Sequence, residues 1–179
     1  MCIRDRVTRT VNVVPAPDTT APVITLIGPS ILTHEAGTSY TDAGATASDN
    51  IDGDITNSLT VSNLVDTNTI GAYSVTYNVS DSAGNAASPF TRIVNVVDTT
   101  APVITLVGDT DITIYSGNPY TDAGATASDN IDGDISSSIS VTNPVDPNTV
   151  GTYTITYNVS DSAATVSYTH LTLPTTPYV

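Results

Sequence analysis

An internal repeat limits what this chain can fold into more than any other feature of its sequence. Residues 18–83 align with residues 98–163 without a gap, and 45 of the 66 paired positions are identical. A fixed period of this kind identifies one structural unit that recurs along the chain. The two copies are therefore expected to share one fold. Identity this high indicates a recent duplication, which does not show which positions are selected.

The repeat divides the 179 residues into segments. Residues 8–14 match residues 91–97, so residues 7–17 are expected to be the last strand of a preceding module and a linker. The remaining expected segments are a complete module at 18–97, a second module at 98–165 without its last strand, and two foreign ends at 1–6 and 166–179. Both ends resemble translated sequencing-adapter DNA and are excluded from fold reasoning. A missing strand exposes a sheet edge, so the second module is expected to be the less stable one unless residues 166–173 fill the gap.

Composition and periodicity favour an all-β module. Val, Ile, Thr and Tyr are frequent, and Gly, Pro, Asn and Asp interrupt the chain at short intervals. Tyr73, Val75, Tyr77 and Val79 alternate with polar residues, which is typical of a half-buried strand. Further strands are expected at residues 22–27, 31–35, 43–48, 55–62 and 90–97. Six or seven short strands without helical periodicity predict two packed antiparallel sheets, and hence tandem immunoglobulin-like β-sandwich modules.

Several single residues have expected places in such a sandwich. Tyr73 follows Thr69-Ile-Gly-Ala, the position of a tyrosine corner, where the ring hydroxyl bonds back to the backbone. The 55–62 strand is expected to place Ile55, Leu59 and Val61 on one face. Asp42, like Asp122 in the second copy, is interpreted as a turn residue before a strand.

Three segments together carry a family resemblance. They are Asp-Thr-Thr-Ala-Pro-Val-Ile-Thr-Leu from Asp18, the sixteen residues from Tyr40 to Ile55, and Gly-Ala-Tyr-Ser-Val-Thr-Tyr-Asn-Val-Ser-Asp-Ser-Ala-Gly-Asn from Gly71. Each copy resembles the bacterial Ig-like domain named after a pesticidal crystal protein and is similar to the hyalin-repeat group. The resemblance implies a module repeated in secreted and surface proteins, beside adhesive or carbohydrate-active domains, with no general catalytic activity. Because fold does not fix function, it implies an extracellular module and little more.

One acidic loop is a candidate calcium site. Asp49-Asn-Ile-Asp-Gly-Asp54 holds three carboxylates in six residues and recurs as Asp129 to Asp134. Such carboxylates repel unless they are neutralised, and Ca²⁺ binds six to eight oxygens on flexible loops. In an Ig-like sandwich this loop, the last hairpin turn and the start of the module lie at the same end. The candidate ligands are Asp18, Asp49, Asn50, Asp52, Asp54 and Asp81 in the first copy, and Asp98, Asp129, Asn130, Asp132, Asp134 and Asp161 in the second. The alternative is that these residues only form turns, since Asp and Asn bond to their own backbone and Asp-Gly is a common turn pair.

Charge and residue inventory exclude several function classes. Four Arg and no Lys stand against 18 acidic residues, which gives a net charge of −14. Nucleic acid and anionic membranes attract clustered basic residues, so neither is expected as a partner. No apolar run in the sequence is long enough for a membrane helix. His34 and Glu35 correspond to Ile114 and Tyr115 in the other copy, so no catalytic set repeats and no enzyme is expected.

The function expected is that of a non-catalytic extracellular spacer or stalk in a bacterial surface or secreted protein. Its partners would be the neighbouring modules of the same chain. Calcium in the acidic loops would stiffen such an array. The alternatives are an adhesive module that binds a glycan or a surface protein, and an accessory domain of a secreted carbohydrate-active enzyme. An adhesive surface normally shows exposed aromatic residues, and only Tyr40, Tyr115 and Tyr120 are candidates outside the strong strand.

Overall fold

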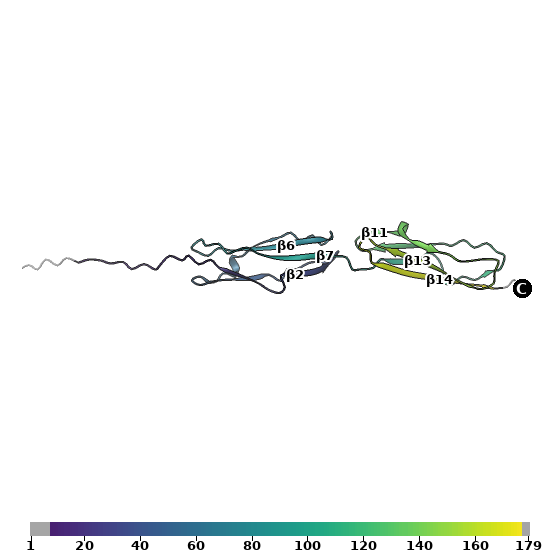
Figure 1. Ribbon diagram of the computed structural model, residues 1–179, viewed down its shortest axis with the longest axis horizontal. Helices are drawn as coiled ribbons and strands as arrows, with labels where there is room; N and C mark the ends of the chain where they lie inside the picture. The colour runs from purple at the N-terminus through teal and green to yellow at the C-terminus, as the bar shows by residue number, and fades with distance from the viewer. Residues whose placement is uncertain (1–7, 177–179) are drawn as a thin grey trace, which may run out of the picture. The chain divides into compact units, whose positions relative to one another are not determined.

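The computed structural model describes residues 8–176 and shows an all-β chain in which each repeat has two sheets (Figure 1). In the first repeat the strand orders are β1-β3-β4 and β2-β7-β6-β5. The bounds are β1 Val23–Leu26, β2 Ile31–Glu35, β3 Ala45–Asp49, β4 Gly53–Asp54, β5 Thr60–Asn63, β6 Gly71–Asn78 and β7 Phe90–Val97, with a 3-10 turn η1 at Thr56–Ser58. The expected foreign residues 1–6 lie outside the described residues.

The second repeat has the same layout, with strand orders β8-β10-β11 and β12-β13-β14-β9. The bounds are β8 Val103–Leu106, β9 Ile114–Tyr115, β10 Ala125–Asp129, β11 Gly133–Asp134, β12 Ser140–Thr142, β13 Thr152–Ser160 and β14 Val166–Thr176, with a 3-10 turn η2 at Ser136–Ser138. Its core joins both sheets, because Ile155, Tyr157, Leu171 and Leu173 pack against Ile104 and Leu106. The predicted all-β sandwich in tandem copies is confirmed.

Alternation along the strands creates the buried layer of each repeat. In β6, Val75 and Tyr77 have side chains exposed by 0% and 1%, and in β7 Val94 is exposed by 0%. The three-stranded sheet adds Ile24, which stands opposite Ala47. One detail of the expected sheets is wrong: β2 runs parallel to β7, from the Ile31–Ile93 pair onward, and β9 runs parallel to β14.

The strand expected over residues 55–62 is also wrong in its first half. The chain forms η1 there, because the Asp54 carboxylate accepts a hydrogen bond from the Thr56 amide at 2.9 Å and starts a turn. The strand β5 begins only at Thr60, and Val61 is 53% exposed rather than buried. A local side-chain bond to the backbone therefore overrides the strand propensity of this segment.

The second repeat has a last strand, although none was expected within its own sequence. Residues 166–176 form β14, which pairs with β13 from Val166–Ser160 to Pro174–Thr152, and Figure 1 shows the two strands side by side. Odd-numbered residues face inward, and Leu171 and Leu173 are 3% and 0% exposed. The segment at 166–173 thus fills the gap that the sequence left open, and the sheet does not end at residue 165.

Arg92 is the largest fully buried side chain among the described residues, with 1% exposure. Its guanidinium forms an ion pair with Asp42 at 2.6 Å and donates to the carbonyls of Ile27 and Gly44. The Tyr77 hydroxyl donates to the other Asp42 oxygen. Asp42 also accepts the Gly44 amide, so the expected turn exists, but the residue has a second role in the core.

The second repeat replaces this arginine by leucine. Asp111 pairs with Thr172, whereas the corresponding Ile31 pairs with Ile93, so Leu171 takes the place of Arg92. Asp122 there accepts the hydroxyl of Tyr157, as Asp42 accepts that of Tyr77, and also the hydroxyl of Tyr120. Desolvation and the Asp122 charge raise the pKa of Tyr120 to about 12.

The tyrosine corners are present as expected. The Tyr73 hydroxyl donates to the Thr69 carbonyl at 2.8 Å, and Tyr153 donates to Thr149 at 3.0 Å.

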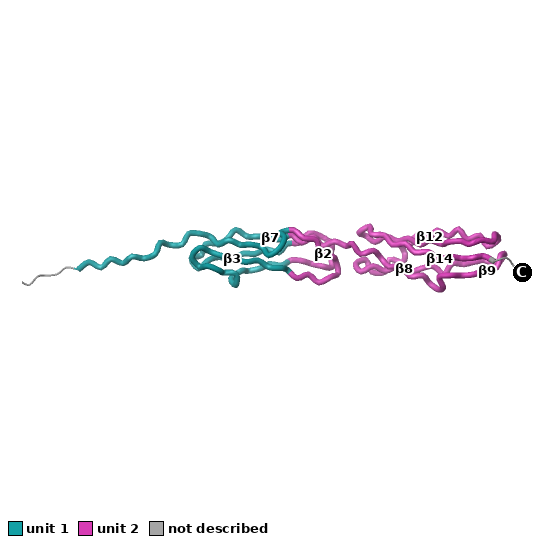
Figure 2. Tube along the Cα trace, turned by 90° about the horizontal axis from the view of Figure 1, so that it is seen from below, with its two compact units in different colours: residues 1–30, 42–63, 74–92 teal, residues 31–41, 64–73, 93–179 magenta. Residues whose placement is uncertain are grey.

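The chain also divides into two compact units, residues 1–30, 42–63 and 74–92 and residues 31–41, 64–73 and 93–179 (Figure 2). Their boundary crosses β6 and β7. No helix within residues 8–176 is long and apolar enough to span a membrane.

Candidate metal centre

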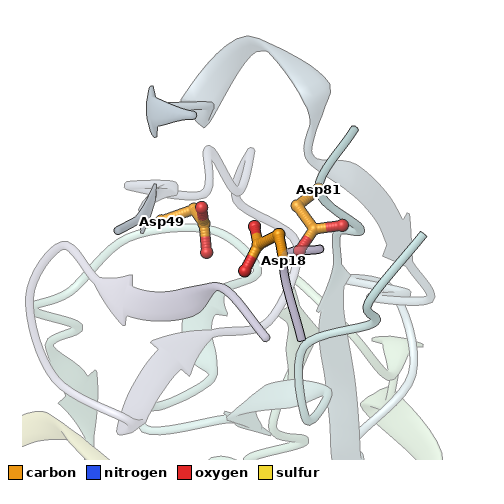
Figure 3. A group of neighbouring side chains, drawn as sticks. All are labelled: Asp18, Asp49 and Asp81. Carbon is orange, nitrogen blue, oxygen red and sulfur yellow. The ribbon is translucent and has the colours of Figure 1, made fainter. Parts of the chain in front are cut away.

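Three aspartates from separate segments of the first repeat meet at one place. β1 and β3 are antiparallel with Val23 opposite Ser48, so the segment before β1 runs beside the end of β3. Asp18 lies in that segment, Asp49 is the last residue of β3, and Asp81 follows β6. One carboxylate oxygen of each lies within 4.8 Å of the other two, and Figure 3 shows the three side chains together.

The second repeat contains the same cluster at the corresponding positions, formed by Asp98, Asp129 and Asp161. Asp98 directly follows the last residue of β7, Asp129 ends β10, and Asp161 follows β13. The side chains of these three aspartates are 7%, 9% and 9% exposed. Two copies of one fold therefore produce the same carboxylate cluster twice.

Local turns fix the orientation of each carboxylate in the first cluster. The Thr20 amide donates to Asp18 Oδ1 at 3.0 Å, and the Ile51 and Asp52 amides donate to Asp49 Oδ1 at 2.8 and 3.0 Å. The Asn85 amide donates to Asp81 Oδ1 at 2.7 Å. In every case Oδ1 makes the turn, as Asp side chains commonly do. Because the turn holds Oδ1 of each carboxylate, it also fixes the position of Oδ2.

The second cluster repeats these bonds. The Thr100 amide donates to Asp98 Oδ1 at 3.1 Å, and the Ile131 amide donates to Asp129 Oδ1 at 2.8 Å. The Thr165 amide donates to Asp161 Oδ1 at 2.8 Å. The same oxygen of each aspartate is thus used in both repeats.

Several of the remaining oxygens are buried without a hydrogen bond. Among the described residues, the Oδ2 atoms of Asp49, Asp98 and Asp129 have no hydrogen-bond donor and almost no contact with solvent. Asp98 and Asp129 are themselves more than nine-tenths buried. A buried carboxylate oxygen without a donor or a cation is costly, because desolvation of a charged group is not offset.

The electrostatics of the clusters follow from these contacts. Burial raises the pKa of Asp98, and the charges of Asp129, Asp161 and Glu35 raise it further against the opposing effect of the Thr100 amide. The Asp52 and Ile51 amides lower the pKa of Asp49. The one ion pair within residues 8–176 joins Arg92 to Asp42, so neither cluster has a basic side chain beside it.

The other predicted ligands lie outside the clusters. Asp52 accepts the amide and hydroxyl of Ser82 at 2.6 and 2.8 Å, which ties its loop to the last turn, and Asp132 does the same with Ser162. Asp54 and Asp134 accept the amides that begin η1 and η2. Asn50 and Asn130 are exposed on their loops. Turn formation therefore accounts for Asp54 and Asp134, while Asp52 and Asp132 connect their loops to the last turn.

Two residues that the sequence did not single out complete the clusters. The Asn85 side-chain amide donates to the Asp18 carbonyl at 3.2 Å and to Asp81 Oδ2 at 2.7 Å. Thr165 takes this place in the second repeat, where its hydroxyl donates to Asp161 Oδ2 and lies 3.0 Å from the Thr100 carbonyl oxygen. The signal available in the sequence was their position four residues after Asp81 and Asp161, the spacing of a closed turn.

The donor set limits which ion the clusters can hold. All candidate ligands are oxygens, which suit hard cations such as Ca²⁺ and Mg²⁺ rather than ions that prefer sulfur or imidazole. Two oxygens bound to one Ca²⁺ at 2.3–2.6 Å are at most about 5.2 Å apart. The separation of no more than 4.8 Å lies inside this limit without any backbone movement.

Two known proteins are similar in sequence to part of this chain. The chain is 39% identical to hyalin of Lytechinus variegatus over 107 residues, which are 57% of this chain and 20% of hyalin. It is 33% identical to the pesticidal crystal protein Cry22Aa of Bacillus thuringiensis over 130 residues, which are 69% of this chain and 17% of that protein. The chain thus spans a fifth or less of the length of these relatives.

A solved structure shows the same fold. The structure of the M60 catalytic domain with the CBM51-1 and CBM51-2 domains from Clostridium perfringens ZmpB aligns over 88% of this chain and 31% of that chain, with a TM-score of 0.51 and 13% identity. The family described as "Bacterial surface protein, Ig-like domain" matches residues 24–96 and again residues 104–170. The predicted resemblance is confirmed, and this chain belongs to the family of Ig-like domains of bacterial surface proteins, in two tandem copies.

Proposed function

We propose that this chain is a non-catalytic extracellular spacer that separates another domain of its parent protein from the bacterial surface or from a neighbouring secreted domain. The observation that carries the proposal is the direct repetition of one sandwich along the chain, with the same strand order in both copies. In an array of this kind, length changes by whole modules while the chemistry of each module stays constant.

The use of the aromatic residues supports a spacer over an adhesive module. Binding surfaces normally present exposed aromatic anchors. In the first repeat, Tyr73 and Tyr77 use their hydroxyls inside the module, and Tyr40 stacks edge-on against His34 with ring centres 5.3 Å apart. Tyr115 is 54% exposed, but Glu35 stands at the matching position of the first copy. These tyrosines therefore do not form an aromatic surface that the two copies share.

The relatives also support a spacer, a role that does not depend on any particular activity of the parent protein. Hyalin and a pesticidal crystal protein each share this stretch, although it makes up only 20% and 17% of their lengths. A module that recurs in proteins with such different names is more simply explained as a building element than as the part that determines their separate activities.

The spacer role is tested by adding length. A further copy of residues 18–97, inserted in register after residue 97, is expected to increase the maximum dimension measured by small-angle X-ray scattering. β6 has 8 residues, so at about 3.4 Å per residue an increment on the order of one strand length, about 27 Å, is expected. An unchanged maximum dimension would contradict the proposal. Saturable binding of the unmodified chain to a glycan or surface protein, abolished by Tyr115→Ala, would favour the adhesive module instead.

A further inference from the structure

We infer that each repeat binds one calcium ion, held by Asp18, Asp49 and Asp81 in the first copy and by Asp98, Asp129 and Asp161 in the second. The inference deepens the proposed spacer function, because the ion would hold the segment that leads into each repeat. Binding of the ion is nevertheless measured separately from any spacer role, so either proposal can fail alone.

The geometry carries the first step. Three separate segments each contribute one carboxylate oxygen, and all three oxygens lie within 4.8 Å of one another in both repeats. Oxygens bound to one Ca²⁺ are at most about 5.2 Å apart. The side chains in Figure 3 are thus close enough for one oxygen of each to share a single Ca²⁺ ion.

The second line of support for a bound ion is that carboxylate oxygens are buried without hydrogen-bond donors. Hydrogen bonds occupy Oδ1 of Asp98 and of Asp129, yet Oδ2 of each is buried with no donor among residues 8–176. These two side chains are only 7% and 9% exposed. A polar atom in that situation requires a partner, and a cation would satisfy both oxygens together.

The third line of support for a bound ion is the uncompensated negative charge of each cluster. Each cluster gathers three carboxylates, and the ion pair of Arg92 with Asp42 is the one ion pair in the described part of the chain. With 18 acidic residues against four Arg, the neutralising charge has to come from solution. An all-oxygen ligand set with irregular spacing suits Ca²⁺, which accepts six to eight ligands in flexible geometry.

The ion would fasten each repeat at its beginning. Asp18 lies five positions before β1, and Asp98 lies five positions before β8. Bound to the same ion as the end of β3 and the turn after β6, Asp18 would no longer move independently of the sandwich. In the second copy the same bond would restrict residues 98–102, which join the two repeats.

Isothermal titration of the full 179-residue chain with calcium chloride tests the inference. Two sites per chain are expected, with dissociation constants of roughly 10⁻⁴ to 10⁻³ M. Asp49→Asn should leave one site and Asp49→Asn with Asp129→Asn should leave none. Asparagine keeps the Oδ1 that accepts the turn amides, so these variants are expected to retain the loop. The pair Asp18→Asn with Asp98→Asn provides an independent removal of both sites.

Matched controls separate a site from general attraction of cations. Asp66→Asn with Asp146→Asn removes the same charge from turns of the same type outside the clusters, where each carboxylate accepts an amide two residues on. This pair should still bind two ions, as should Asp54→Asn with Asp134→Asn. No saturation up to 10-fold above the expected constants (roughly 10 mM), equal loss in the controls, or binding that survives both cluster pairs would overturn the inference. An equal response to magnesium would overturn the assignment to calcium.

Thermal unfolding gives a second readout that a purely structural role would not produce. At 1 mM calcium and a dissociation constant near 0.1 mM, the ratio of folded to unfolded repeat rises about elevenfold, which is about 1.4 kcal/mol or roughly 6–11 °C for a module of this size. Asp49→Asn should lower the first repeat's midpoint in calcium but not in EDTA, where it relieves repulsion between like charges. A decrease of the same size under both conditions would indicate a turn residue only.

Discussion

Arg92 is buried in the first repeat at the place that Leu171 occupies in the second, so Arg92→Leu imposes on one copy the residue that the other already has. The substitution leaves Asp42, which is 14% exposed, without its ionic partner. The Ile27 carbonyl loses its arginine donor as well. The second repeat has no arginine at this place, and there Tyr157 and Tyr120 both donate to Asp122.

The expected loss is large for a single substitution. Breaking a buried ion pair by removing one partner costs about 3–5 kcal/mol, because the remaining charge is left uncompensated. A domain is usually stable by only about 5–15 kcal/mol. Arg92→Leu with Asp42→Asn removes the stranded charge, so the double variant should be more stable than the sum of the two single losses by about 1–3 kcal/mol.

Hydrogen exchange followed by mass spectrometry measures this in the intact chain. Peptides covering β6 should exchange roughly 100- to 4000-fold faster in Arg92→Leu, since each 1.4 kcal/mol is tenfold. Peptides covering β13 serve as an internal control and should not change. The reasoning is refuted if protection of β6 falls less than about fivefold, equivalent to 1 kcal/mol, or if the double variant shows no coupling. Either result would mean that the hydrogen bonds Asp42 keeps, from the Tyr77 hydroxyl and the Gly44 amide, compensate its charge without the arginine.

Three further substitutions have expected outcomes. Glu35→Gln should reduce the acid sensitivity of the first repeat in melts between pH 6 and 2. Hydrogen bonds from Thr100 and Thr99 lower the pKa of Glu35 to about 2, so its contribution is present above its ordinary pKa of 4.5 and is lost as the pH falls toward 2. An unchanged pH profile would contradict this. Leu173→Ala should destabilise the second repeat by about 2–5 kcal/mol, because the side chain is 0% exposed. Urea unfolding with no change would mean that β14 is not part of the core. Tyr73→Phe removes the bond to the Thr69 carbonyl and should cost about 0.5–1.5 kcal/mol in the same assay, and a larger loss would indicate that the ring itself is displaced.

The predictable part of this structure is the part set by local pattern. Alternation at Val75 and Tyr77 indicated the inward face of β6, and the hydroxyl of Tyr73 bonds where the tyrosine corner was expected. Topology also indicated that the start of the module, the acidic loop and the last turn converge, as Asp18, Asp49 and Asp81 do. Each of these follows from strand period and strand order alone.

Long-range pairing of polar groups was the part that the pattern did not reveal. Arg92 is in phase with the buried Val94 and Val96, but no local pattern indicates that its charge is compensated there, because its partner Asp42 lies 50 positions away in the sequence. The failed half of the 55–62 strand has a local cause, since Asp54 starts a turn instead. β14 was expected only as an alternative in which residues 166–173 fill the gap, because residues 166–176 match no part of the repeat, although alternate residues there bring Leu171 and Leu173 inward.

The two interpretations of the acidic loop, turn formation and cation binding, concern different atoms of the same side chains. Oδ1 of Asp49 and Oδ1 of Asp129 accept the amides that form the turns, while Oδ2 of each is buried without a donor. Asp54, by contrast, uses its carboxylate for η1 and lies outside the cluster, so turn chemistry alone explains it. A turn needs one oxygen, and asparagine supplies it as well as aspartate does. At Asp49, Asp98 and Asp129 a second charged oxygen is buried without a donor, which turn formation leaves unexplained and a bound cation would explain.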